Sequence, residues 1–177
     1  MIDHLFLRRS MYVSILVLVF LAASFVRLLP LSHGTTLFPP PELGLMLAFA
    51  WTLRRPDYVP VILVAFLFLI GDMLFMRPPG VWPALAVIAL EFLRTRQASA
   101  HEQTFLAEWV LVTGVVFAMI LMEWLVLTVF MVDHASFGKG LLRIVSTAAF
   151  YPVVVLVSTW GFGVARPRPG ELDAEVI

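Results

Sequence analysis

The sequence predicts an all-α integral membrane protein, a bundle of about six transmembrane helices in which the second helix is short. Composition is the first reason. Hydrophobic residues make up 61% of the 177 residues and charged residues 14%, whereas soluble domains have about 45–50% apolar and about 25% charged residues. Patterning is the second reason, because apolar runs recur along the chain between short segments rich in proline and arginine. Mean hydropathy is +0.97, and the chain is predicted to lie in a membrane.

Six apolar runs are expected to form the helices, covering residues 11–29, 42–53, 59–76, 83–97, 102–132 and 141–164. The second run would give a helix of about 18 Å, too short for a hydrocarbon core of about 30 Å. We therefore expect a short or partly re-entrant second span, which Arg54, Arg55 and Pro56 end in water. Pro152 should kink the last span, because proline removes an internal hydrogen bond.

The first apolar run has an alternative interpretation as a cleaved signal peptide, since basic residues precede it and residues 22–24 resemble a cleavage site. The later runs are equally apolar, which favours a retained first helix with Ser10 as its N-cap. Residues 1–164 are then expected to form a single transmembrane helical domain. Residues 165–177, which contain Arg-Pro twice, are expected to form a disordered cytoplasmic tail.

The distribution of basic residues predicts the orientation. If six spans alternate in direction, both termini share one side with eight of the twelve basic residues, namely Arg8, Arg9, Arg54, Arg55, Arg94, Arg96, Arg166 and Arg168. The other four fall on the opposite side, namely Arg27, Arg77, Lys139 and Arg143. Because cytoplasmic segments are rich in lysine and arginine, both termini are expected in the cytoplasm. The turns at residues 31–38, 77–80 and 133–140 are expected outside.

Signatures of catalysis and of cofactor or metal binding are missing. The chain has no cysteine, and its four histidines stand in tails or turns without a metal-binding spacing. It has no nucleophile elbow and no glycine-rich phosphate loop. Gly71 and Asp72 faintly resemble an intramembrane aspartyl protease motif, but Leu69 breaks it and no second aspartate lies mid-membrane. Zero net charge speaks against nucleic acid as a partner. We expect no enzyme and no cofactor.

Four ionisable residues are expected in the outer half of the membrane, namely Asp72, Glu123, Arg27 and Arg143. An ionisable group inside a bilayer is costly unless it has a partner. The cluster has two interpretations, as pairs that hold the bundle together or as a site for a ligand or partner. Asp72 is expected to pair with Arg143 in preference to Arg27, because Arg143 enters the membrane from the outer side at a depth compatible with Asp72. The long arginine side chain can also reach the short aspartate.

Two small residues one helical turn apart, Gly114 and Ala118, stand within the fifth run. Such small-xxx-small pairs allow two helices to approach closely. The pair predicts contact with a neighbouring helix. Glu91 and Arg94 are neighbours three residues apart near the cytoplasmic edge, and both side chains are expected to extend toward water.

The stretch from Pro41 to Gly80 resembles a known family. A short apolar helix ends in Trp51-Thr-Leu-Arg54-Arg55-Pro56, the next span carries Gly71-Asp72, and the following turn carries Gly80. With the length, six apolar segments and an arginine-ended fourth helix, this pattern is similar to the bacterial rod shape-determining protein MreD. The motif residues carried over are Arg54, Arg55, Pro56, Gly71, Asp72 and Gly80.

The resemblance implies a fold like that of the substrate-binding S-components of vitamin transporters. It also implies a non-catalytic scaffold subunit, in the bacterial inner membrane, of the cell-elongation machinery that synthesises side-wall peptidoglycan. The implied partner is an MreC-like protein, with the RodA polymerase, a class B penicillin-binding protein, MreB filaments and membrane lipid nearby. The alternative is a substrate-binding membrane subunit of a small-molecule transporter. Such a subunit is expected to carry Ala-x-x-x-Ala motifs, which this sequence lacks.

Overall fold

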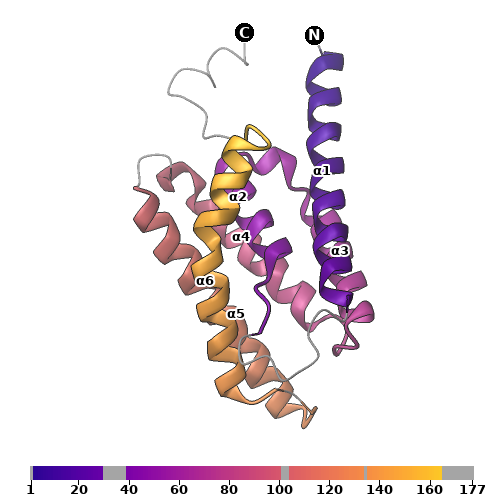
Figure 1. The fold of residues 1–177 in the computed structure, drawn as a ribbon, viewed down its shortest axis with the longest axis vertical. Coiled ribbons are helices and arrows are strands. Elements are labelled where there is room, and N and C mark those ends of the chain that lie inside the picture. The colour runs from indigo at the N-terminus through magenta and orange to yellow at the C-terminus, as the bar shows by residue number, and fades with distance from the viewer. Residues whose placement is uncertain (1, 30–38, 101–103, 134, 165–177) are drawn as a thin grey trace.

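A computed structural model describes residues 2–29, 39–100, 104–133 and 135–164. All the regular secondary structure in this part of the chain is helical, and it contains no strand. Its elements are α1 (Ile2–Leu28), α2 (Leu43–Arg54), the 3₁₀ helix η1 (Pro56–Tyr58), α3 (Val61–Leu74), α4 (Val81–Ala100), α5 (Phe105–Val129) and α6 (Phe137–Trp160) (Figure 1). The predicted turn at 31–38 and the predicted tail at 165–177 lie outside the described residues.

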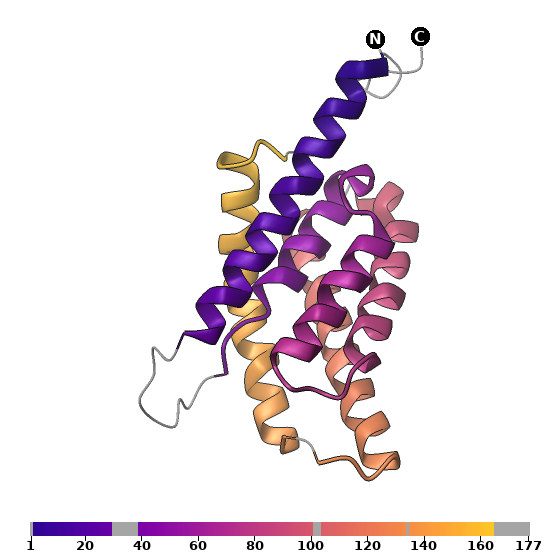
Figure 2. The ribbon, with the colours of Figure 1, turned by 90° about the vertical axis from the view of Figure 1, so that its right-hand side faces the viewer.

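The six α-helices run alternately in opposite directions, so that the molecule has two distinct ends (Figure 2). We call the end with the start of α1 and the end of α6 the proximal end. The distal end holds the end of α1, residues 39–42, the turn at 75–80, and residues 130–133 and 135–136 between α5 and α6. Basic residues segregate between these ends as the sequence predicts, with Arg27, Arg77 and Arg143 distal.

Helix α2 is the centre of the bundle. All residues from Leu45 to Arg54 are buried, because α1, α4 and α6 pack around this helix. A helix that is apolar on every side is typical of a buried position. The predicted short second helix is confirmed, and its bounds differ from residues 42–53 by one residue at each end.

Three helices are long and apolar enough to cross a bilayer, at Leu7–Leu28, Phe105–Val129 and Phe137–Trp160. Helices α2 and α3 are shorter apolar helices. Large apolar side chains also cover the outside of the bundle, for example Ile62, Leu106 and Leu18. The protein is therefore a helical membrane protein, while the count of six spans stays a prediction.

Some helix bounds differ from the sequence-based expectation. Helix α1 begins at Ile2, so Ser10 lies within it, and its Oγ donates to the Leu7 carbonyl over 2.9 Å instead of capping the helix. Helix α3 begins two residues late, because Pro56–Tyr58 forms a 3₁₀ turn and Pro60 is its N-cap. Helices α4 and α6 begin earlier than expected, α5 begins later, and α6 continues through Pro152.

Candidate functional site

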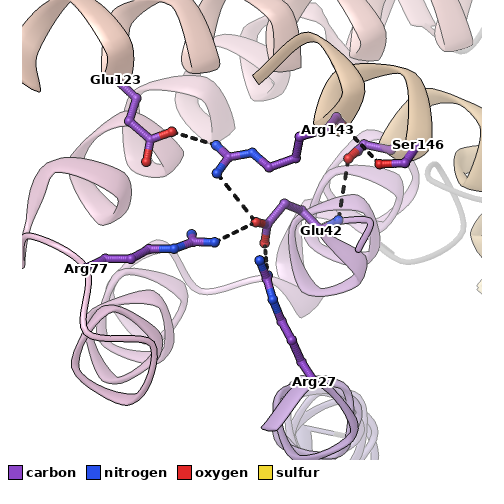
Figure 3. A network of polar contacts seen from close by, with 7 residues as sticks. Arg27, Glu42, Arg77, Glu123, Arg143 and Ser146 are labelled. Carbon is purple, nitrogen blue, oxygen red and sulfur yellow. Dashed lines mark hydrogen bonds and ion pairs between the residues drawn. The ribbon is translucent and has the colours of Figure 1, made fainter. Parts of the chain in front are cut away.

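The distal end holds a network of charged side chains centred on Glu42, which immediately precedes α2 and is 6% exposed (Figure 3). Its carboxylate accepts one hydrogen bond from Arg27 and one from Arg77, each over 3.0 Å. Arg143 Nη1 lies 3.9 Å from Glu42 Oε1. One carboxylate thus joins arginines from α1, from the turn at 75–80 and from α6. This arrangement places three cations around one buried anion, which offsets the cost of burying each charge.

Arg143 extends the network to α5. Arg143 Nη2 donates to Glu123 Oε2 over 2.6 Å. A separate contact links Glu42 to α6, since the Glu42 backbone N–H donates to the Thr147 hydroxyl over 3.5 Å. Aromatic rings support the guanidinium groups, since Arg143 lies 4.5 Å from the ring centre of Trp82 and Arg27 lies 4.7 Å from that of Phe75. Such cation–π contacts contribute about 0.5–2 kcal/mol each. The predicted cluster of Arg27, Glu123 and Arg143 is therefore brought together, with Glu42 as its centre.

Asp72, the fourth residue of the predicted cluster, has a different partner. It is 1% exposed, and its Oδ2 accepts a hydrogen bond from the Gly80 backbone N–H over 3.1 Å. Gly80 has a φ of +96°, a left-handed conformation that glycine adopts without strain. Two motif residues thus fasten the turn between α3 and α4. The predicted ion pair of Asp72 with Arg143 is wrong, because Arg143 pairs with Glu123 and approaches Glu42 instead.

Two cavities flank the network. Cavity 1, of about 340 Å³, lies between α1, α2 and α3. Cavity 2, of about 350 Å³, lies among the distal ends of α5 and α6 and the turn at 75–80. Arg27 and Arg77 line both cavities. These two arginines therefore form a wall that cavities 1 and 2 share.

A second ionic cluster lies at the proximal end and was not expected. Arg54 donates to both carboxylate oxygens of Glu108, over 2.8 and 3.3 Å. The Tyr151 hydroxyl donates to Glu108 Oε1 over 2.6 Å. All three residues are buried. The prediction that Arg54 ends α2 in water is wrong, because Glu108 on α5 balances its charge inside the bundle. Tyr151 on α6 donates to this carboxylate in turn. Of the other two residues at that boundary, Arg55 is half-buried and Pro56 begins η1.

The predicted small-residue contact is not made within the described part of the chain. Gly114 and Ala118 are exposed, and a Cβ added at Gly114 would meet no atom within 4 Å. This pair lies on the outward face of α5. Glu91 and Arg94, which were expected to extend toward water, form an ion pair with 3.3 Å between Arg94 Nη1 and Glu91 Oε1. Arg94 also donates to the Val59 carbonyl, which links α4 to the start of α3.

Neither cluster has the composition of a metal centre. Within the described ranges, no three histidine, aspartate or glutamate side chains gather in a way that could hold a metal ion. The distal network consists of cations that hold carboxylates, and this chemistry can bind an anion beside it or fix helices. No family model, no curated protein and no solved structure matches this chain.

Proposed function

We propose that this chain is a non-catalytic scaffold subunit of the bacterial cell-elongation machinery, similar to MreD, in the inner membrane. Its direct partner would be an MreC-like protein, with RodA, a class B penicillin-binding protein and MreB in the same assembly. The proposal rests on the resemblance in residues 41–80. What supports it is that this stretch contains the buried central helix and the turn fastened by Asp72 and Gly80.

Two ionisable motif residues, Arg54 and Asp72, have internal structural partners. Arg54 binds Glu108 and Asp72 binds the Gly80 backbone, so these two motif charges join elements of the bundle. A scaffold needs a rigid set of helices that presents a constant outer surface to its partners. We further propose six spans with both termini in the cytoplasm. The alternating direction of the helices supports this orientation, together with the basic residues at the proximal end.

Depletion in a rod-shaped host tests the scaffold proposal. Cells should become round, and purification of the tagged full-length chain should recover an MreC-like protein. Re-expression of the wild-type chain is the control and should restore rods. Normal cell shape combined with impaired uptake of a small molecule would contradict the proposal.

The alternative, a substrate-binding subunit of a transporter, is favoured by one observation. Cavity 1 combines charged and aromatic side chains inside a helical bundle, as expected for a small-molecule site. The two functions differ in their partners. Recovery of a pair of ATPases with the tagged chain would favour the transporter, whereas recovery of an MreC-like protein would favour the scaffold.

A further inference from the structure

The wall of cavity 1 is apolar along most of its length. The rings of Phe20, Phe68 and Phe75 line it. Its rim includes Val26, Leu29 and Leu43, which are 54%, 40% and 38% exposed on the outer surface. A rim of exposed apolar side chains on a membrane protein faces the hydrocarbon chains of lipids. Cavity 1 is therefore open to molecules that lie in the bilayer.

The opposite wall of cavity 1 is charged. Arg27 and Arg77 line it, and each donates one hydrogen bond to Glu42. A guanidinium has five N–H donors, and these two side chains keep 22% and 20% of their surface exposed. Each arginine thus has further donors that an acceptor in the cavity can reach. Arginine donors match the oxygens of a phosphate group in geometry and charge.

The charged groups around cavity 1 suit a headgroup that carries both a phosphate and an ammonium. Three arginines, Arg27, Arg77 and Arg143, contact two carboxylates, Glu42 and Glu123, and Asp72 is a third acid in the lining of cavity 1, so these six charges balance. Asp72 also lines cavity 1, where the Gly80 N–H holds its Oδ2. Asp72 offers a partner to a headgroup that carries an ammonium beside its phosphate.

We propose that cavity 1 binds one phosphate-bearing membrane lipid. The phosphate contacts the free N–H donors of Arg27 and Arg77, and a hydrocarbon chain lies along Phe20, Phe68 and the apolar rim. The site is independent of the proposed function, because it rests only on the cavity and its charges. It assigns a binding role to the distal network in addition to its role in joining the helices.

Lipid retention by the purified full-length chain tests the proposal. Native mass spectrometry in detergent would compare phosphatidylglycerol and phosphatidylethanolamine with diacylglycerol, which keeps the chains but lacks phosphate, and with inorganic phosphate, which lacks the chains. Both phospholipids should bind at least about tenfold more tightly than diacylglycerol, because charge-assisted hydrogen bonds are lost without the phosphate. Equal retention of diacylglycerol, or equally tight binding of inorganic phosphate, would overturn the proposal.

Two neighbouring alanines provide a matched pair of variants. Ala23 lines cavity 1, whereas Ala22 is exposed and does not line it. Ala23→Phe should fill the cavity and reduce phospholipid retention by about tenfold, a loss equivalent to about 1.4 kcal/mol. Ala22→Phe adds the same ring on the outside and should retain lipid as the wild type does. Equal retention by both variants would contradict the assignment.

Two further variants keep the test decisive if Ala23→Phe does not fold. Gly71→Leu fills cavity 1 from α3, where a Cβ would lie 3.7 Å from the Phe20 ring, an ordinary contact distance. It should weaken phospholipid retention as Ala23→Phe does. Arg27→Gln removes phosphate donors and should weaken the binding of phospholipids without changing that of diacylglycerol. Unchanged phospholipid retention in either folded variant would contradict the proposal.

Discussion

The two ionic clusters of this bundle differ in how completely the protein encloses them. At the proximal end, Arg54 and Glu108 form a two-hydrogen-bond pair in which the side chains are 6% and 0% exposed. At the distal end, Glu42 is shared among arginines that keep 14–22% of their surface exposed and lie beside two cavities. The proximal cluster is closed, and the distal cluster is open.

The difference in exposure gives the two clusters different roles: the enclosed proximal cluster joins helices, and the accessible distal cluster can also bind a ligand. The proximal pair is enclosed by the bundle, so its contribution is to fix α2 against α5 and α6. The distal arginines have donors that Glu42 and Glu123 do not use, so they can hold a ligand as well as the helix ends. Buried charge alone does not indicate a binding site. Access from a cavity is the feature that distinguishes the two ends.

The largest loss of stability is expected for Glu108→Gln. The change leaves the Arg54 charge buried without its counter-ion, and removing one partner of a buried pair typically costs about 3–5 kcal/mol. Unfolding of the purified chain by SDS in mixed micelles would measure the loss. A loss below about 1 kcal/mol, the range of exposed pairs, would show that the proximal cluster is not closed.

A smaller loss, of about 2 kcal/mol, is expected for Glu42→Gln. The charge-assisted hydrogen bonds to Arg27 and Arg77 are weakened, but these arginines are partly exposed and can be solvated after the change. The same SDS titration would compare this variant with Glu108→Gln. A loss as large as that of Glu108→Gln would remove the distinction between an open and a closed cluster.

The distal turn provides a third prediction. Gly80→Ala should cost about 1–2 kcal/mol, since a side chain disfavours the left-handed conformation, and the added Cβ would meet no atom within 4 Å. Backbone strain at residue 80 then accounts for the whole loss of stability. Gly114→Ala, on the exposed face of α5, is the matched control and should be neutral or stabilising. Equal stabilities of the two variants would contradict the role of Gly80.

The smallest change is expected for Glu91→Gln. Glu91 is 56% exposed in its pair with Arg94, and exposed pairs within a helix contribute about 0.3–0.5 kcal/mol. The SDS titration of this variant should nearly overlay that of the wild type. A loss of about 2 kcal/mol or more would mean that exposure does not determine the strength of these pairs.

The sequence predicts the helices better than the partners of their charges. The short second helix is found within one residue at each end, because Pro41 and Arg54 mark its boundaries in the sequence itself. Three of the four charges expected at the distal end, Arg27, Glu123 and Arg143, do lie together. Helices that alternate in direction bring them to the same end, and that alternation can be predicted from the sequence.

The choice of partner depends on tertiary packing and could not be predicted. Glu42 becomes the centre of the network because α2 begins inside the bundle, with arginines from three other elements around it. Arg54 is buried because Glu108 and Tyr151 arrive from helices far along the chain. One signal was present, since Glu108 stands in an apolar helix and therefore needs a buried partner.

The thermal stability of the purified chain in rising phosphatidylglycerol tests the contrast between the two clusters most directly. A lipid that binds only the folded state raises the melting temperature as its concentration increases. Glu108→Gln should lower the starting temperature but keep the rise, whereas Arg27→Gln should lower the starting temperature less and lose the rise. If both variants kept the rise, or if both lost it, the assignment of structure to the proximal cluster and of binding to the distal cluster would be contradicted.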